Sequence, residues 1–287
     1  MVKHLGVVGA GTMGAAIAQA AALAGIETSL YDINGTVLRQ ALERIKTNLK
    51  SGVEHGTVSE SQSIEALGRI HQRTRLNELN HSEIVVEAVI EDLRIKKDLL
   101  KHLEADTKPT TILATTTSAL SVTAVGSATR HPEKVVGLHF LNPATSATLV
   151  EVVRGQQTSA ETVQRSLEFT NQLSKTAVVV NDAPGFIVNR LVQPFYGEAL
   201  RILGDQIADR TQIDRLMRVL GGFEFGPFES MDQLGLDSSL SVTQSLYEQT
   251  SGEPRYRPHP ILKRMVESGM LGRKSGSGFY TYADSKK

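Results

Sequence analysis

The first 180 residues contain short apolar runs separated by amphipathic stretches. Seven runs have the length and composition of buried strands, at residues 5–8, 28–31, 84–89, 111–114, 135–140, 149–153 and 177–180. Helical patterns lie between several of these runs, at residues 15–24, 37–50, 92–104 and 161–173. Strands that alternate with helices predict an α/β fold with a doubly wound, mostly parallel sheet.

The pattern changes after residue 180, where the sequence NDAPGF interrupts it. Four helical patterns follow, at residues 187–203, 212–220, 240–249 and 261–267, and a further strand is expected at most in the last few residues. We therefore expect two domains: residues 1–183, with a helical insert near 37–67, and an all-helical domain over residues 184–287.

A glycine-rich turn follows the first predicted strand. Its sequence is G-x-G-x-x-G, formed by Gly9, Ala10, Gly11, Thr12, Met13 and Gly14. A strand precedes the turn, a helix follows it, and Asp32 ends the next strand eighteen residues after Gly14. In such a turn the second glycine admits a pyrophosphate, the third allows close helix packing, and the helix N-terminus offers N–H groups to the anion. The pattern predicts a Rossmann-type dinucleotide site. The alternative is a plain turn with a helix-capping Asp.

Asp32 also predicts which dinucleotide binds. Its carboxylate can accept hydrogen bonds from the adenosine ribose, and it would repel a 2′-phosphate. No cation stands just behind it, because residues 33–35 read Ile-Asn-Gly. NAD is therefore favoured over NADP.

Composition excludes several other classes of protein. The 287 residues carry 31 basic and 31 acidic side chains, so the balanced charge argues against a nucleic-acid or membrane-surface partner. There are no cysteines, which excludes disulfides and thiolate chemistry, and we expect no metal. The longest mostly apolar stretch is too short to span a bilayer. The N-terminus enters a strand-like run directly, without a leader pattern, so a cytoplasmic location is expected.

Polar side chains gather where three predicted strands end. They are Glu87 and Glu91 after one strand, residues 115–118 after another, and His139 and Asn142 after a third. Each has an ordinary structural explanation, such as complementing a helix dipole, capping a helix or forming an Asn-Pro turn. Carboxyl ends of parallel strands share one edge, however, and ligands bind there.

His139 and Glu151 are two ionisable residues inside apolar runs, twelve positions apart. Burying either one is costly unless it has a partner. The Asn142-Pro143 turn allows the chain to return, which would bring Glu151 alongside His139. A carboxylate on one imidazole nitrogen fixes the tautomer and stabilises the cation. The two residues are thus predicted to form a catalytic dyad, against the alternative of a lone structural histidine.

Together with further motifs, these features resemble the 3-hydroxyacyl-CoA dehydrogenase family, including bacterial 3-hydroxybutyryl-CoA dehydrogenases. The resemblance extends over nearly the whole chain. The resemblance is carried by GAGTMG, EAVIED, TTTSALS, GLHFLNP followed by LVEVV, DAPGFIVNRL, GPFESMDQLGLD and GRKSGSGFY, in this order. It implies a Rossmann domain followed by a helical domain that usually dimerises. It also implies NAD-dependent interconversion of (3S)-3-hydroxyacyl-CoA and 3-oxoacyl-CoA, in fatty acid or butanoate metabolism.

The resemblance also assigns roles to individual residues. It implies that His139 is the catalytic base and Glu151 its orienting partner, and that Ser118 and Asn189 hydrogen-bond the reacting oxygen or thioester. The residues implied to approach the cofactor, besides the glycine turn and Asp32, are Glu91, Lys96, Ser118, Asn142 and Lys274. The helical insert resembles the hairpin that borders coenzyme A, and Asn48 and His55 lie where contacts with coenzyme A would fall.

Two segments depart from the family. Many relatives have Asn-Thr-Ser where this chain has Thr116-Thr117-Ser118, and residues 144–148 read ATSAT where relatives commonly place Met and then Lys or Pro. Both segments touch the expected substrate pocket, so they bear on the choice of acyl group.

Other functions fit the sequence less well. A serine hydrolase using Ser118, His139 and Glu151 lacks a G-x-S-x-G elbow. A dehydrogenase of free hydroxy acids, such as the gulonate dehydrogenases, tends to have His-Pro where this chain has His139-Phe140. A lysine-based β-hydroxyacid dehydrogenase would need a G-x-G-x-x-x-K-x-x-N motif, which does not occur. A non-catalytic NAD-binding protein remains a further alternative.

Overall fold

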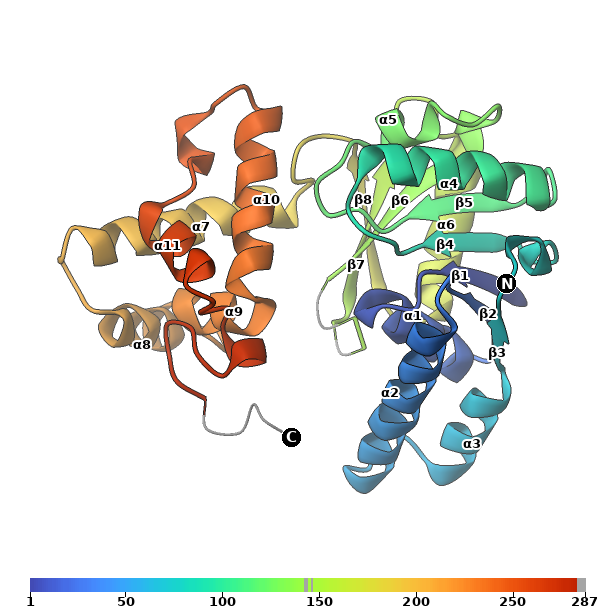
Figure 1. Cartoon of the computed structure of the whole chain (residues 1–287), viewed down its shortest axis with the longest axis horizontal. Coiled ribbons are helices and arrows are strands. Elements are labelled where there is room, and N and C mark those ends of the chain that lie inside the picture. The colour runs from blue at the N-terminus through green and yellow to red at the C-terminus, as the bar shows by residue number, and fades with distance from the viewer. Residues whose placement is uncertain (142–143, 146, 283–287) are drawn as a thin grey trace. The chain divides into compact units, whose positions relative to one another are not determined.

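The computed structural model describes residues 1–141, 144–145 and 147–282. The chain forms two compact units, Met1–Ala183 and Pro184–Lys287. Figure 1 labels the helices and strands of both units.

The N-terminal unit is built on one eight-stranded sheet with the strand order β3-β2-β1-β4-β5-β6-β7-β8. The strands are β1 (His4–Val8), β2 (Glu27–Tyr31), β3 (Ile70–Arg73), β4 (Ile84–Glu87), β5 (Ile112–Thr115), β6 (Val135–Phe140), β7 (Leu149–Arg154) and β8 (Thr176–Asn181). Neighbouring strands pair in parallel except β6 and β7, which are antiparallel. The predicted doubly wound, mostly parallel sheet is confirmed.

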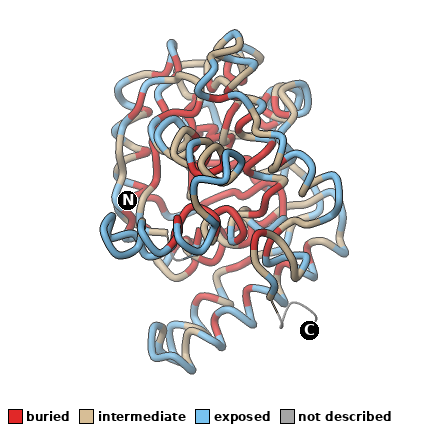
Figure 2. Tube along the Cα trace, turned by 90° about the vertical axis from the view of Figure 1, so that its left-hand side faces the viewer, coloured by how far each residue is buried: buried red, intermediate tan, exposed pale blue. Residues whose placement is uncertain are grey.

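Helices flank this sheet. They are α1 (Thr12–Leu23), α2 (Gly35–Glu54), α3 (Glu60–Gly68), α4 (Leu93–Asp106), α5 (Val122–Gly126) and α6 (Ala160–Gln172). Figure 1 shows α4 and α5 together along one side of the sheet, away from α1. Buried residues follow the central strands, as Figure 2 shows, and side chains of α1, α2 and α6 complete the core.

Local sequence explains where the helices of the insert begin and how they pack. Asn34 caps α2 by accepting from the Thr36 amide, and Ser59 forms a capping box with Gln62 at the start of α3. On α2 the buried positions recur at helical spacing: Leu38, Ala41, Ile45 and Leu49. This stripe faces the core beside α1, so the insert is a hairpin of α2 and α3 anchored to the dinucleotide-binding half of the sheet.

The C-terminal unit is helical. Its helices are α7 (Val188–Gly204), α8 (Arg210–Gly221), α9 (Pro227–Leu234), α10 (Leu236–Gln249) and α11 (Pro260–Glu267). Two buried carboxylates tie its last residues to this bundle. Asp232 accepts from the amides of Phe279 and Tyr280 and from the Tyr282 hydroxyl, all at 2.9 Å, and Asp214 accepts from the Tyr280 hydroxyl at 2.8 Å.

Strand β3 and helices α5 and α9 were not predicted. The strand β3 reads IHQR and lies at the edge of the sheet beside β2 alone, so its polar residues face water and it lacks an apolar run. Helix α9 begins within a sequence that reads as a turn, but Pro227 at its first position and Glu229 bonding back to the Gly226 amide start a helix. In the described part of the last residues, Ser277 bridges to Gly272 and Thr281 without forming a longer strand.

Candidate active site

One row of register partners crosses the sheet near the carboxyl ends of its parallel strands. It runs through Tyr31, Val8, Glu87, Thr115, Gly137 and Val153. Asp32 and Gly9 follow this row by one residue, and His139 follows it by two. Since ligands of such sheets bind beyond the carboxyl ends of the strands, the predicted polar residues are brought to the expected edge.

The glycine turn has the tight geometry that a dinucleotide requires. Gly9 has φ +99°, and a Cβ on Gly14 would lie 1.8 Å from the Gly9 carbonyl oxygen, so neither position accepts a larger residue. A Cβ on Gly11 would meet no atom within 4 Å, which leaves open space beside the start of α1. That helix start has no side-chain cap and no acidic residue in its first turn. These features fit an anionic pyrophosphate at the helix N-terminus.

Asp32 is held in place by the turn it faces. Its Oδ2 accepts from the Ala10 amide at 2.8 Å, and its Oδ1 accepts from the Asn34 amide at 2.8 Å. Each carboxylate oxygen can accept more than one hydrogen bond. Asp32 can therefore bind ribose hydroxyls while it remains fixed beside the turn.

A buried ion pair lies at the ends of β4 and β5. The Lys96 ammonium and the Glu87 carboxylate are both fully buried and 2.7 Å apart. Glu87 also accepts from the Val89 amide at 2.8 Å and from the Thr115 hydroxyl at 2.7 Å. Lys96 is the fourth residue of α4, which places it one turn into the helix that follows this strand. The pair fixes that helix start to two strand ends.

Glu91 extends this cluster toward the surface. Its carboxylate lies 3.4 Å from the Lys96 ammonium and accepts from the Thr117 hydroxyl and from the Ser118 amide at 2.9 Å. The structure thus brings together three of the residues that the family resemblance places at the cofactor, namely Glu91, Lys96 and Ser118.

His139 and Glu151 are paired as the sequence predicts. They are register partners on the antiparallel strands β6 and β7, and His139 Nδ1 lies 2.6 Å from Glu151 Oε2. Both side chains are buried, with exposed fractions of 6% and 1%. A carboxylate at this distance holds the imidazole in one orientation and stabilises its protonated form. This arrangement fits a group that exchanges a proton with a substrate.

Lys175 supports the segment that departs from the family. It lies in the turn between α6 and β8, is 8% exposed, and its ammonium donates to the Ala147 carbonyl at 2.5 Å. Burial lowers the pKa of Lys175. A buried ammonium thus fixes one end of the 144–148 segment, of which residues 144, 145, 147 and 148 are described.

The remaining predicted residues belong to the helical insert, to the C-terminal unit or to the part of the chain outside the described residues. Asn48 donates to Gln19 of α1 at 3.3 Å, and His55 directly follows α2 as its C-cap, with its Nδ1 2.7 Å from the Ser51 carbonyl. In the C-terminal unit, Asn189 is the second residue of α7, and Lys274 bonds Asp237 at 2.6 Å. Asn142 lies outside the described residues.

Sequence reasoning did not find the partners that hold these residues. Glu87 was recognised only as a strand-end carboxylate, and its pairing with Lys96 follows from the strand–helix connection. The contact of Lys175 with Ala147 joins positions 28 apart and leaves no local signal. Within the described residues no group of three potential metal ligands occurs, and no helix is long and apolar enough to cross a membrane.

A Rossmann sheet, an anion-ready glycine turn beside a ribose-binding carboxylate, and a buried His–carboxylate pair define a dinucleotide-dependent dehydrogenase. Comparison with known protein families shows to which family of dehydrogenases the chain belongs. Residues 4–183 match the NAD-binding domain of 3-hydroxyacyl-CoA dehydrogenase, and residues 185–282 match its C-terminal domain. The chain belongs to the 3-hydroxyacyl-CoA dehydrogenase family and is an NAD-dependent oxidoreductase.

Individual relatives cover the whole chain. A probable 3-hydroxybutyryl-CoA dehydrogenase of Bacillus subtilis is 38% identical, over 99% of this chain and 98% of that protein. The crystal structure of (S)-3-hydroxybutyryl-CoA dehydrogenase from Ralstonia eutropha has a TM-score of 0.92 and 34% identity, and the match covers 99% and 100% of the two chains. A 3-hydroxyadipyl-CoA dehydrogenase of Escherichia coli is 40% identical over 98% of this chain and 59% of that protein. The predicted family, cofactor and enzyme class are confirmed, and the alternatives are not favoured.

Proposed function

We propose that the protein interconverts (3S)-3-hydroxyacyl-CoA and 3-oxoacyl-CoA with NAD, and that short-chain substrates such as 3-hydroxybutyryl-CoA are preferred. The observation that carries the proposal is the 2.6 Å contact between His139 Nδ1 and Glu151 Oε2 at the carboxyl edge of an NAD-binding sheet. Short-chain preference is supported by the full-length relatives from Bacillus subtilis and Ralstonia eutropha, which are named as 3-hydroxybutyryl-CoA dehydrogenases.

In the proposed mechanism, His139 Nε2 takes the proton of the 3-hydroxyl group as the alcohol is oxidised. NAD, when bound, accepts the hydride from C3. Glu151 keeps Nδ1 protonated and oriented, and its negative charge stabilises the imidazolium that forms. In the reverse direction the same imidazolium returns the proton to the 3-oxo group.

Further roles rest on the family resemblance. We assign Ser118 a hydrogen bond to the reacting oxygen, where a donor stabilises charge that changes during the reaction. Asn189 of the C-terminal unit is assigned a hydrogen bond to the same oxygen or to the thioester. For coenzyme A itself, Asn48 and His55 on the helical insert are the proposed contacts.

The proposed cofactor contacts fall into two groups. The turn residues and Asp32 would hold the pyrophosphate and the adenosine ribose. The nicotinamide half is assigned to Glu91, Lys96, Ser118, Asn142 and Lys274. Both Glu87 and Glu91 lie within 4 Å of the Lys96 ammonium. We therefore propose that this lysine acts mainly by holding Glu91 and the ends of strands β4 and β5 in place.

We also propose that the enzyme is a cytoplasmic homodimer formed through its C-terminal unit. Apolar side chains are exposed near the end of α8, with exposed fractions of 55% for Leu216, 72% for Val219 and 80% for Leu220. A contiguous exposed apolar face of this kind is typical of an interaction surface. Sedimentation equilibrium tests the proposal: Leu220→Glu should convert a dimer to a monomer, and a wild-type monomer would refute it.

The test of the proposed reaction is one absorbance assay that follows NADH. Acetoacetyl-CoA, longer 3-oxoacyl-CoAs, a dicarboxylic 3-oxoacyl-CoA and free 3-oxo acids are supplied side by side. We expect the highest kcat/KM with acetoacetyl-CoA. Preference for the dicarboxylic thioester would correct the acyl group, and turnover only of free acids would overturn the assignment to coenzyme A esters.

A further inference from the structure

Arg44 connects the helical insert to the glycine turn. It lies on α2, and its guanidinium Nη2 donates to the Ala10 carbonyl at 2.9 Å, across 34 positions of sequence. Ala10 itself is fully buried. Neither the glycine pattern nor the insert predicts this contact, because it depends on how α2 packs against α1.

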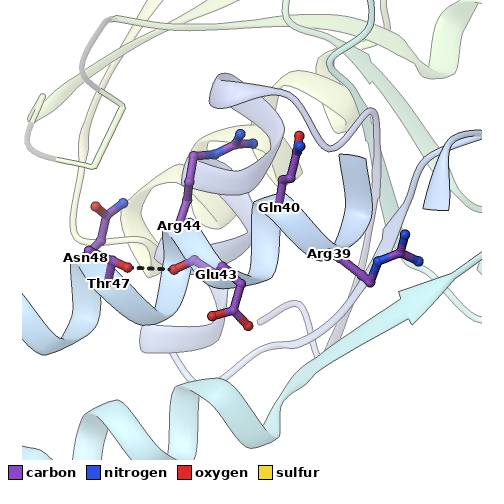
Figure 3. A pocket seen from close by; sticks show the side chains of 6 residues that line it. All are labelled: Arg39, Gln40, Glu43, Arg44, Thr47 and Asn48. Atoms are coloured by element: carbon purple, nitrogen blue, oxygen red, sulfur yellow. Dashed lines mark hydrogen bonds between the residues drawn. The ribbon is translucent and has the colours of Figure 1, made fainter. Parts of the chain in front are cut away.

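The surroundings of Arg44 form a hollow of about 550 Å³ along α2. Two rows at a spacing of four residues line it, and they consist of Arg39, Gln40, Glu43, Arg44, Thr47 and Asn48. Figure 3 shows Arg44 and Gln40 extending from one side of α2 and Glu43 from the opposite side. The row with Arg44 also contains Asn48, which donates to Gln19 of α1. This face of α2 therefore contacts α1 and the turn that precedes it at two points.

The contact with Arg44 completes a set of bonds that fixes the turn. The amide of Gly9 donates to the Tyr31 carbonyl at 2.8 Å, and the amide of Ala10 donates to Asp32 at 2.8 Å. Arg44 then holds the carbonyl of Ala10. Because a trans peptide unit is planar and its C=O and N–H groups point in opposite directions, holding this carbonyl also orients the Gly11 amide. Three successive peptide units of the turn are thus fixed by different parts of the fold.

The charge of Arg44 also suits this position. Glu43, the nearest acidic neighbour in sequence, is paired with Lys46 at 2.7 Å. In the described part of the chain, no carboxylate lies within 4.0 Å of the Arg44 guanidinium, and Arg44 is exposed. A guanidinium without a carboxylate partner, next to an uncapped helix N-terminus, adds to the positive potential there.

We propose that Arg44 is a positioning residue of the cofactor site, which holds the Ala10–Gly11 peptide in the orientation that presents the start of α1 to the pyrophosphate of NAD. The role rests on NAD binding at the turn, which is part of the proposed function, but not on the identity of the acyl group. The helical insert thereby contributes to cofactor binding as well as bordering the proposed coenzyme A site.

The experiment measures equilibrium binding of NADH by fluorescence, without any acyl-CoA, to the wild type, Arg44→Gln and Arg39→Gln. Arg39 is the matched control, because it lies on the same helix and in the same hollow, and among the described residues its side chain donates to Thr36 alone. We expect Arg44→Gln to raise the Kd of NADH about five- to tenfold, the upper part of the net range for a single hydrogen bond. The Kd of Arg39→Gln should stay within about twofold, on the usual scale of a surface substitution.

Two further measurements separate positioning from general destabilisation. ADP-ribose, which carries the pyrophosphate, should lose affinity as NADH does, whereas adenosine should bind both forms equally. Arg44→Lys, which keeps the charge and one donor, should restore part of the affinity and also serves if Arg44→Gln does not fold. Unchanged NADH affinity in Arg44→Gln, or an equal loss in Arg39→Gln, overturns the proposal. If the wild type turns over no acyl-CoA, that result would contradict the proposed substrate but not the role of Arg44.

Discussion

His139 and Glu151 are register partners on two antiparallel strands, with the imidazole Nδ1 and the carboxylate Oε2 2.6 Å apart and both side chains buried. This pairing depends on β7, which runs antiparallel to β6 and parallel to its other neighbour, β8. Backbone hydrogen bonds of the sheet therefore set the distance between the base and its orienting carboxylate.

Replacing His139 should remove the proton acceptor. In His139→Gln we expect kcat for acetoacetyl-CoA reduction to fall about 10²–10⁴-fold, the usual scale for a general acid or base. The Kd of NADH should change by less than about twofold, because the glycine turn and Asp32 are untouched. Stopped-flow turnover and NADH fluorescence check the two quantities, and near-normal turnover would show that another group transfers the proton.

Glu151→Gln should preserve the shape of the site while removing the charge that stabilises the imidazolium. We expect kcat to fall by about 10²-fold or more, the order of magnitude for a wrongly oriented or unassisted base. The pH dependence of kcat should also change, which a purely structural role would not produce. The measurement is a kcat profile over pH 5–9 for both proteins. A profile superimposable on that of the wild type would contradict the partner role.

Asp32 should determine the choice of dinucleotide. Asp32→Asn retains an oxygen that can accept from the Ala10 amide but lacks the charge that binds ribose hydroxyls and repels a 2′-phosphate. We expect NADH to bind about tenfold more weakly, the scale of losing a charged hydrogen bond, and the preference for NADH over NADPH to shrink. Titrations of both cofactors check this, with Asp98→Asn on the surface of α4 as the control. Equal affinity of the wild type for NADPH would refute the role of Asp32.

The buried pair of Lys96 and Glu87 predicts a non-additive effect on stability. Lys96→Met leaves a buried carboxylate without its cation and should lower the free energy of unfolding by about 3–5 kcal/mol. Adding Glu87→Gln removes that charge, so the double variant should recover part of the loss. Urea unfolding measures both, and the exposed Lys101→Met on the same helix should change stability by less than about 0.5 kcal/mol. If the effects of the two substitutions on the free energy of unfolding simply add, Lys96 and Glu87 are not directly coupled.

The tyrosines of the C-terminal unit predict a loss of stability at alkaline pH. Burial, followed by the hydrogen bond to Asp214, raises the pKa of Tyr280, and burial with the bond to Asp232 raises the pKa of Tyr282. A group whose pKa is higher in the folded state contributes stability that is complete below its unfolded pKa, near 10, and is lost as the pH rises through the folded pKa. The free energy of unfolding should therefore decline above about pH 10.

The matched comparison for this decline is Tyr280→Phe with Tyr282→Phe against Tyr247→Phe, in urea titrations between pH 8 and pH 11.5. The double variant should show a flatter decline, because it lacks two of the phenols whose pKa the fold raises. If the double variant and Tyr247→Phe decline equally, the two bonds to Asp214 and Asp232 are not the cause.

The sequence predicted those parts of the site that depend on local pattern. The glycine turn, Asp32 and the strand–turn–strand return that pairs His139 with Glu151 follow from residues close together or from simple alternation of polar and apolar positions. The strand β3 escaped prediction because an edge strand with one neighbour needs no apolar run. The bonds of Arg44 to Ala10 and of Lys175 to Ala147 escaped because they join elements whose packing no local pattern encodes.

The antiparallel pairing of β6 and β7 separates two properties that enzymes often change together. The base and its carboxylate are set by the register of two strands, while residues 144–148 belong to the connection between them. Substitutions in that connection leave the register intact, whereas a one-residue slip of β7 would turn Glu151 to the other face of the sheet. Directed evolution of acyl preference should therefore find its variants in the connection, and the proton-transfer pair offers a fixed point around which a library can be built.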